Sequence, residues 1–359
     1  MKDQSHKSGS IMDGQAYSEE QRAGQRLMVG FDGTEFNDDL MFLIETLKVG
    51  GIILFARNLS SPGQIRNLCQ SVQQYAGSCG QPPLFIAIDQ EGGQVARLKE
   101  PFTQFSGNPC MESHVGAEHF AKVTASELAG VGINMNMAPV MDVAPKDCNS
   151  VMAGRAFGHD PAWVADLGVK VIENLQKNHI ISVTKHFPGI GRTTLDSHLD
   201  LPELDIDLAT LESTDLFPFQ AAIDCGVAGI MLAHVRYRPL DPDWPASLSR
   251  ILSRKILRDR MGFGGLVLTD DLDMGAIAKH YDIKTVTRQI TDAGIDIALI
   301  CHRSAKIESA FETIVNGFRD SERLRVMGDE SMVRILRLKQ KYCSRSEVQG
   351  STFRVRGKH

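Results

Sequence analysis

The stretch Gly265-Leu266-Val267-Leu268-Thr269-Asp270 decides the fold of this chain. It is apolar without alternation and ends in a carboxylate, as expected for a parallel strand that is buried on both faces. Similar runs recur along the chain at Leu27–Phe31, Gly51–Phe55, Leu84–Ile88, Ile133–Ala138, Ile181–His186, Gly229–His234 and Asp296–Cys301. Eight strand-then-helix units predict a closed (β/α)8 TIM-type barrel. An open doubly wound sheet is the alternative, but no GxGxxG follows an early strand.

Amphipathic segments with helical periodicity separate these strands. They cover Ser61–Tyr75, Glu112–Gly130, Pro161–Lys177, Leu208–Cys225, Ser249–Met261, Lys284–Ala293 and Ala305–Phe318. One more helical segment, about Ser321 to Tyr342, is expected to pack on the exterior of the barrel. We therefore predict a single barrel domain over residues 16–343, a disordered segment over 1–15 and a polar, basic tail over 344–359.

Composition argues against several classes of function. The 359 residues carry a formal net charge of −5 without a Lys/Arg-rich run in the body, which makes nucleic acid an unexpected partner. The chain shows neither a secretory signal nor an apolar run of about 18 residues, so we expect a cytoplasmic protein that does not bind membranes. The seven scattered cysteines lack CxxC spacing and indicate reduced thiols rather than a zinc site. We expect a monomer.

Polar side chains recur where five of the expected strands end, which is the end of a barrel that carries active sites. They lie in Asp89–Arg97, Asn136–Asp142, Lys185-His186, His234 and Thr269–Met274. Asp270 should point into the mouth of the barrel as a nucleophile, a metal ligand or a structural cap. Its neighbours Asp271 and Asp273 fit helix caps, because Asp favours the first turn of a helix, or groups that support the site without lining it. No HExxH or comparable ligand spacing supports a metal site.

The segment that follows Lys185-His186 contains a second constellation. It is too rich in Gly, Thr and Pro to be helical, and in an extended backbone residues two apart point the same way. Asp196 can therefore hold and polarise the imidazole of His198, which makes that histidine a positioned acid/base. We expect this loop to close over bound substrate. Such a cluster suggests an enzyme.

Several charged residues allow a structural interpretation as well. Asp89 and Arg97 could bind sugar-like hydroxyls or form a salt bridge that closes their loop, in which Gly92-Gly93 allows a sharp turn. Arg155 lies in a loop, where a lone arginine is usually solvated. The remaining histidines divide in two groups. His186 and His234 could be satisfied core residues, whereas His280 and His302 have no supporting partner in the sequence and are expected at the surface or behind the residues that line the site.

The motifs named so far occur in an ordered set that resembles the β-N-acetylglucosaminidases of glycoside hydrolase family 3. The likeness runs from about Gly24 to about Arg337. It rests on Gly50–Asn58, Asp89–Arg97, Asn134–Val143, Lys185–Gly189, Asp196–His198, Pro245–Ser249 and Thr269–Met274.

This resemblance implies a role for each site residue. Asp270 would be the nucleophile, and His198 the general acid/base, which Asp196 orients. The residues that would bind the terminal N-acetylglucosamine are Asp89, Arg97, Arg155, Lys185 and His186. The implied activity is a retaining exo-β-N-acetylglucosaminidase that forms a covalent glycosyl-enzyme and needs no metal or organic cofactor. Its implied substrate is a cytoplasmic peptidoglycan fragment, GlcNAc-1,6-anhydroMurNAc with or without peptide.

One position departs from the family pattern. Family members usually read Pro-Gly-His-Gly where this chain has Pro188-Gly189-Ile190-Gly191, so we expect activity with altered loop dynamics or aglycone preference. Two further hypotheses stay open. The chain could be a family 3 glycosidase or phosphorylase with another sugar preference, or a catalytically silent sugar-binding protein. Intact Asp270, Asp196 and His198 argue against the silent protein.

Overall fold

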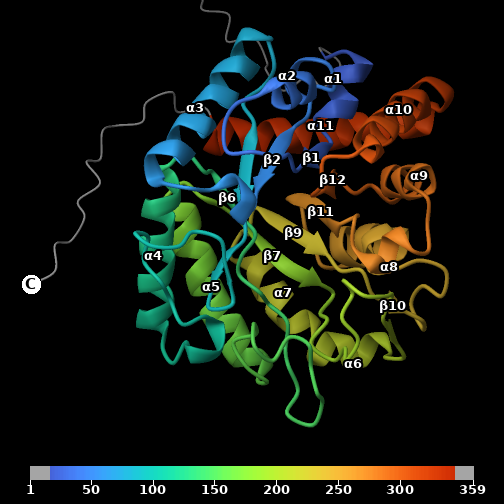
Figure 1. The fold of residues 1–359 in the computed structure, drawn as a ribbon. Coiled ribbons are helices and arrows are strands. Elements are labelled where there is room, and N and C mark those ends of the chain that lie inside the picture. The colour runs from blue at the N-terminus through green and yellow to red at the C-terminus, as the bar shows by residue number, and fades with distance from the viewer. Residues whose placement is uncertain (1–16, 344–359) are drawn as a thin grey trace, which may run out of the picture.

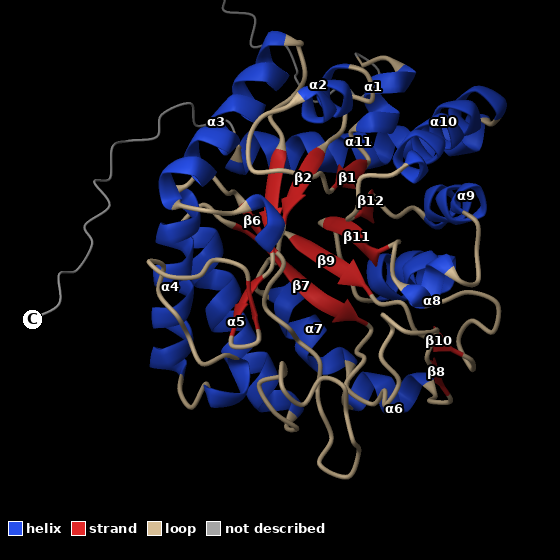
Figure 2. Cartoon of the chain, in the orientation of Figure 1, coloured by secondary structure: helices blue, strands red, loops and turns tan. Residues whose placement is uncertain are grey.

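The computed structural model describes residues 17–343 and forms a closed barrel of parallel strands. Figures 1 and 2 show the strands at the centre and the helices around them. Around the barrel the strands are β1 (Leu27–Val29), β2 (Gly51–Leu54), β3 (Phe85–Ile88), β6 (Met135–Asn136), β7 (Ile181–Phe187), β9 (Gly229–Leu232), β11 (Leu266–Asp271) and β12 (Ile297–Ile300). The pairing of β1 with β12 closes the ring. The predicted TIM-type fold and its eight strands are confirmed.

Six long helices cover the outside of the barrel where helical periodicity predicts them. They are α3 (Pro62–Ser78), α4 (His114–Gly130), α5 (Pro161–Lys177), α9 (Ile283–Ala293), α10 (Ala305–Asp320) and α11 (Glu322–Tyr342). Polar side chains start several of them: the Ser61 hydroxyl, for example, accepts the N–H of Gln64 at the start of α3. Two short helices were not predicted, α1 (Glu19–Gly24) and α2 (Asp38–Glu45).

Two predicted helices differ in detail. The segment 208–225 is not one helix but two, α6 (Leu208–Ser213) and α7 (Leu216–Asp224). Helical geometry is lost between them at Thr214, and the neighbouring Asp215 carboxylate accepts a hydrogen bond from Arg192 at 2.9 Å. The segment predicted as 249–261 is a helix of π type over Ile251–Arg260. Short elements complete the chain: α8 (Gly275–Ala278), β4 (Gln90–Gly92), β5 (Val95–Ala96), β8 (Glu203–Leu204), β10 (Arg236–Tyr237) and 3₁₀ turns at Ala56–Asn58, Asn108–Cys110 and Ala246–Leu248.

The core consists of two layers, and this explains why the strands are continuous apolar runs. In β11, Val267 packs in the layer between strands and helices, whereas Leu266 and Leu268 fill the barrel interior. The same division separates Ile52 from Ile53 in β2. Because successive side chains point to opposite faces, a strand that is buried on both faces needs apolar residues at every position.

Helix α11 closes the N-terminal end of the barrel. Its Ile335 and Tyr342 join the interior cluster that contains Met28 and Phe85. The Lys339 ammonium donates to the Gln25 side chain at 2.6 Å and to a backbone carbonyl at 2.8 Å. The predicted extra C-terminal helix is thus present, but it closes the floor of the barrel and contributes to the interior cluster, whereas packing on the exterior was predicted. The predictions for segments 1–15 and 344–359 lie outside the described residues. Within residues 17–343, no helix combines the length and apolar character needed to cross a membrane.

A buried ionic cluster holds α11 to this end of the barrel. Asp296, directly before β12, is fully buried. Its carboxylate pairs with Arg258 at 2.7 Å and with Arg334 of α11 at 2.9 Å, and it also accepts the Ser331 hydroxyl. Although burial opposes ionisation, the two guanidinium groups lower the pKa of Asp296 below its ordinary value of 3.8.

We expect Asp296→Asn to lower the free energy of unfolding by about 3 kcal/mol at pH 7, because it leaves two guanidinium groups without their carboxylate. Since the folded-state pKa is depressed, this contribution is present above pH 3.8 and is lost as the pH falls further. Urea unfolding at pH 7 and at pH 3 measures both effects, with exposed Asp320→Asn as control. An equal loss at the two pH values would contradict the ionic explanation.

Candidate active site

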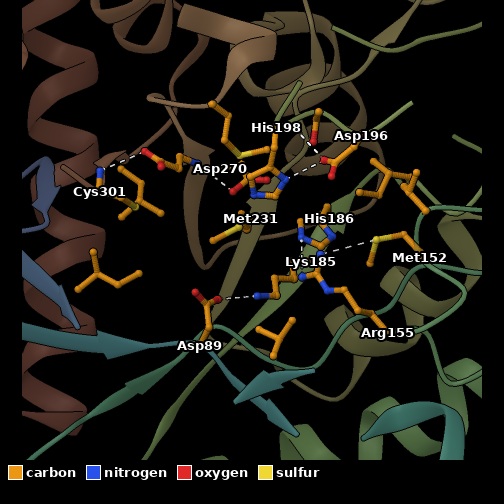
Figure 3. A pocket seen from close by; sticks show the side chains of 18 of the residues that line it. Asp89, Met152, Arg155, Lys185, His186, Asp196, His198, Met231, Asp270 and Cys301 are labelled. Atoms are coloured by element: carbon orange, nitrogen blue, oxygen red, sulfur yellow. Dashed lines mark hydrogen bonds and ion pairs between the residues drawn. The ribbon is translucent and has the colours of Figure 1, made fainter. Parts of the chain in front are cut away.

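A cavity of about 370 Å³ opens at the C-terminal end of the strands. Figure 3 shows the charged side chains that converge on it from separate strands and loops. The structure brings together all the site residues predicted from the sequence. The cavity is lined by Asp89, Arg97, Arg155, Lys185, His186, Asp196, His198 and Asp270, together with the apolar or sulfur-bearing side chains of Ile53, Phe55, Met152, Met231, Met274, Leu299 and Cys301.

One side of the cavity is a network of buried charges. Lys185 at the end of β7 is 2% exposed, and its ammonium lies 2.7 Å from Asp89 and 2.6 Å from Glu91. Arg155 forms a two-pronged pair with Glu91 at 2.7 and 3.1 Å. Arg97 approaches Asp89 at 3.3 Å. The loop arginine Arg155 is therefore held rather than solvated, and the Asp89–Arg97 salt bridge exists within a larger network.

These pairs settle the charge of the network. Burial disfavours ionisation of Asp89, but Lys185 and Arg97 outweigh it and hold the pKa of Asp89 well below its usual range. Burial likewise opposes the charge of Lys185, and the carboxylates of Asp89 and Glu91 raise its pKa. Each group is ionised near neutral pH, so the cavity presents fixed donors and acceptors that suit the hydroxyls of a sugar.

Asp270 enters the cavity from the end of β11, as the apolar run before it predicts. Its Oδ1 accepts the N–H of Asp271 at 2.8 Å, which fixes the carboxylate. Burial opposes its ionisation, whereas the neighbouring imidazoles, the N–H of Asp271 and the Lys185 ammonium lower the pKa of Asp270. An ionised, oriented carboxylate in a cleft has the properties of a nucleophile.

The loop after β7 (residues 188–202, the dyad loop) carries the Asp196–His198 pair, which lines the cavity with both side chains exposed. His198 Nδ1 lies 2.7 Å from Asp196 Oδ1, and the same carboxylate oxygen accepts the His198 N–H at 2.9 Å. The predicted dyad therefore forms, but the predicted extended backbone is wrong: the segment is a turn, in which the N–H of Leu199 donates to the carbonyl of Asp196 at 2.9 Å. The His198 imidazole is 66% exposed, so solvent and a leaving group can both reach it. A carboxylate on Nδ1 leaves Nε2 to exchange protons.

Comparison with known proteins places this barrel in a family. The family model described as the glycosyl hydrolase family 3 N terminal domain matches residues 18–338. The chain belongs to glycosyl hydrolase family 3. The resemblance inferred from its motifs is thereby confirmed.

Relatives in this family are described as β-hexosaminidases. A β-hexosaminidase from Nitrosomonas eutropha is 36% identical over 77% of this chain and 80% of its own length. Beta-hexosaminidase A from Pseudoalteromonas piscicida is 35% identical over 86% of this chain, which spans 56% of that protein. The solved family 3 β-N-acetylglucosaminidase from Paenibacillus is 37% identical with a TM-score of 0.88, over 91% of this chain and 63% of the other. The chain thus spans little more than half to two thirds of the length of some relatives.

Two residues that hold side chains of the cavity were not predicted. Glu91 links Lys185 to Arg155, and Asp142 orients His186 by accepting its Nδ1 hydrogen at 2.7 Å. Both occur in strand-end segments that the sequence already singles out, Glu91 only two residues after Asp89. The feature of the sequence that could have identified them is their position beside the end of a strand.

Ile190, the departure from the family pattern, lines the cavity with its side chain nearly buried. Its backbone N–H donates to Asp142 Oδ1 at 2.8 Å, an interaction that no side chain at this position changes. The substitution therefore makes one wall of the cavity more apolar while the turn that leads into the dyad loop keeps its anchor.

The other candidate histidines have structural partners. His234 is buried between the Ser247 hydroxyl at 2.6 Å and the Asp271 carbonyl at 2.8 Å, which satisfies both ring nitrogens, and burial lowers its pKa. His280 and His302 are exposed, in line with the expectation that they lie at the surface or support the site from outside, and the structure gives each a carboxylate partner. His280 lies 2.5 Å from Asp200, and His302 lies 3.4 Å from Asp273. Both contacts join segments that are distant in sequence.

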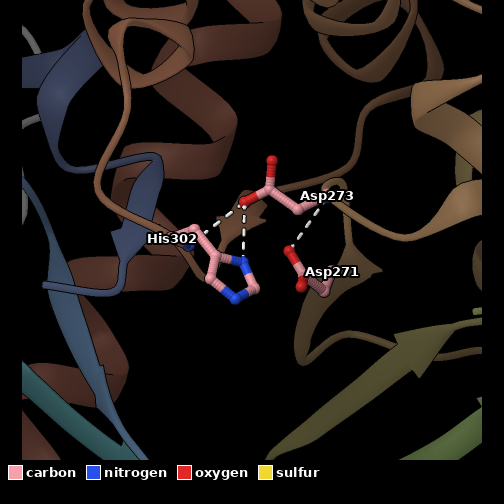
Figure 4. A group of neighbouring side chains, drawn as sticks. All are labelled: Asp271, Asp273 and His302. Carbon is pink, nitrogen blue, oxygen red and sulfur yellow. Dashed lines mark hydrogen bonds and ion pairs between the residues drawn. The ribbon is translucent and has the colours of Figure 1, made fainter. Parts of the chain in front are cut away.

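Asp271 and Asp273 do not cap helix α8, contrary to one of the predicted interpretations. The Asp271 carboxylate accepts the N–H groups of Asp273 and Cys301, so it stabilises the turn after β11. Burial raises the pKa of Asp271 to about 6. Figure 4 shows these two carboxylates with His302, whose potential ligand atoms lie within 4.8 Å of one another. Lys306 already neutralises Asp273 at 2.6 Å, which disfavours a cation there.

We expect Glu91→Gln to weaken the binding of N-acetylglucosamine about tenfold, because Lys185 and Arg155 lose the charge that holds both donors in place. Titration calorimetry measures the affinity. Glu118→Gln, which removes an exposed carboxylate that pairs with Lys122, is the control. Wild-type affinity in Glu91→Gln would show that the network does not preorganise the sugar site.

Proposed function

We propose that this family 3 chain is a retaining exo-β-N-acetylglucosaminidase. The observation that carries the proposal is that the Asp270 carboxylate and the Asp196–His198 dyad face one cavity, whose inner side is built from ionised hydroxyl-binding groups. A cavity that ends on a buried network accommodates a terminal sugar rather than the interior of a glycan chain. The names of the relatives, β-hexosaminidase and β-N-acetylglucosaminidase, support a hexosamine in this position.

In the first step Asp270 attacks the anomeric carbon of the bound sugar. A carbon–oxygen bond to the enzyme forms as the glycosidic bond breaks, and the Nε2 proton of His198 passes to the departing oxygen. Asp196, on Nδ1, stabilises the imidazolium that must exist before this transfer. Asp89, Arg97, Arg155, Lys185 and His186 hold the sugar through its hydroxyl and acetamido groups.

In the second step water takes the place of the leaving group. His198, now neutral, accepts a proton from the water molecule. The water oxygen attacks the anomeric carbon and releases the Asp270 carboxylate. The sugar keeps its configuration after the two inversions. The exposed dyad suits this exchange, because the aglycone must leave and water must enter on the same side.

We also propose a specific substrate, GlcNAc-1,6-anhydroMurNAc with or without peptide, and its cleavage in the cytoplasm. Both parts of this proposal derive from the family resemblance. An open mouth with the dyad at its rim agrees with a bulky aglycone, since only the terminal sugar has to enter the cavity.

The test uses 4-nitrophenyl N-acetyl-β-glucosaminide with and without inorganic phosphate. Asp270→Ala should lower kcat at least about a thousandfold, because no covalent intermediate can form, and His198→Ala about a hundredfold or more. Continuous absorbance of nitrophenolate measures both, with His114→Ala on the outer face of α4 as control. Retained configuration of the first-formed sugar is read by NMR.

Each contrary outcome identifies the part that fails. Turnover by Asp270→Ala equal to wild type would remove the nucleophile assignment. Accumulation of a sugar 1-phosphate would make the chain a phosphorylase. Sugar binding without turnover by the wild type would indicate a silent sugar-binding protein instead.

A further inference from the structure

The dyad loop rests on α8, the short helix that begins five residues after Asp270 in the chain. The N–H of Gly275 donates to the carbonyl of His198 at 3.1 Å, and the N–H of Ala276 donates to the carbonyl of Ser197 at 3.0 Å. These bonds use the first free N–H groups of a helix, which have no partner within the helix itself. The backbone of the dyad is thus bonded to the segment that carries the nucleophile.

Gly275 is where the loop comes closest to this helix. A Cβ atom placed there would lie 2.6 Å from the carbonyl oxygens of both His198 and Leu199. Both contacts are with backbone, so they cannot be relieved by a side-chain rotation. Any residue other than glycine at this position would therefore push the loop away from α8.

A second contact joins the far ends of the same two segments. His280, just beyond α8, lies with its Nε2 2.5 Å from Oδ1 of Asp200, two residues after His198. The same carboxylate oxygen accepts the N–H of Leu201 at 2.8 Å, which fixes its orientation. His280 therefore binds the C-terminal part of the dyad loop through Asp200.

Helix α8 under this loop is buried, whereas the side chains of the dyad are exposed. Ala276 and Ile277 of α8 are at most 1% exposed, and the neighbouring Tyr281 is held by Arg236 at 3.0 Å. By contrast, the side chains of Asp196 and His198 are more than half exposed. With so little side-chain burial to position the dyad, its location depends on the contacts with α8.

We propose that Gly275 and His280 are positioning residues that hold the dyad loop on α8 and thereby place His198 above Asp270. The acid/base part of this inference rests on the proposed function, whereas the docking of the loop does not. Because α8 follows the nucleophile directly, one rigid segment sets the relative position of both catalytic groups.

Amide hydrogen exchange of Gly275 and Ala276 tests the docking without any substrate, since these N–H groups are protected only while the loop is bound. In the full chain, His280→Ala should speed their exchange about two- to fivefold, the range for an exposed ion pair. In Gly275→Val, Ala276 should exchange about tenfold faster. His280→Gln retains an N–H donor toward Asp200 and should restore protection. His114→Ala removes a comparable exposed histidine that faces Asp166 and should change nothing.

Two glycosides separate positioning of the acid from general damage. A 4-methoxyphenyl leaving group needs a proton, whereas a 2,4-dinitrophenyl group departs without one. Gly275→Val should lower kcat/KM about tenfold for 4-methoxyphenyl N-acetyl-β-glucosaminide, and His280→Ala about threefold, with less than a twofold change for the dinitrophenyl substrate.

Wild-type exchange rates in both variants would overturn the docking, whatever the activity. Equal losses on the two glycosides would overturn the positioning of the acid. If exchange responds as expected but the wild type cleaves neither glycoside, the docking holds and the proposed function fails.

Discussion

Lys185 is held between two carboxylates, Asp89 at 2.7 Å and Glu91 at 2.6 Å, in a position where it is almost inaccessible to water. A buried ammonium is tolerated only with such partners, because its desolvation is otherwise too costly. The constraint fixes the end of β7 against the loop after β3, on which Arg97 and Arg155 then depend. The groups proposed to bind the sugar are in this way oriented in its absence, and binding need not order them.

Much of this arrangement could be predicted because it follows from local pattern. Strands buried on both faces show themselves as continuous apolar runs, and the end of a barrel strand directs Asp270 into the mouth. The pairing of Asp196 with His198 was predicted from their two-residue spacing, although the backbone that brings them together is a turn and not the extended segment expected. Each of these inferences needs only neighbours in the chain.

What could not be predicted depends on residues far apart in sequence. The sequence near Glu91 does not predict that Lys185 and Arg155 will pair with it. Likewise, Asp215 at the break between α6 and α7 accepts a hydrogen bond from the distant Arg192. The partners of His280 and His302 likewise come from other loops. The topology of the fold determines contacts between different loops, so the pattern of residues within one segment cannot predict them.

The contact between the dyad loop and α8 has a consequence for modularity. Asp270 and His198, the proposed catalytic pair, both belong to this barrel, and hydrogen bonds join the backbone of the dyad loop to α8, which begins five residues after Asp270. Both proposed catalytic groups would therefore stay together in any protein in which the barrel is joined to other domains. Relatives of which this chain spans 56% or 63% show that family 3 barrels occur in longer architectures. Added domains can then diversify where the enzyme acts while the reaction itself remains intact.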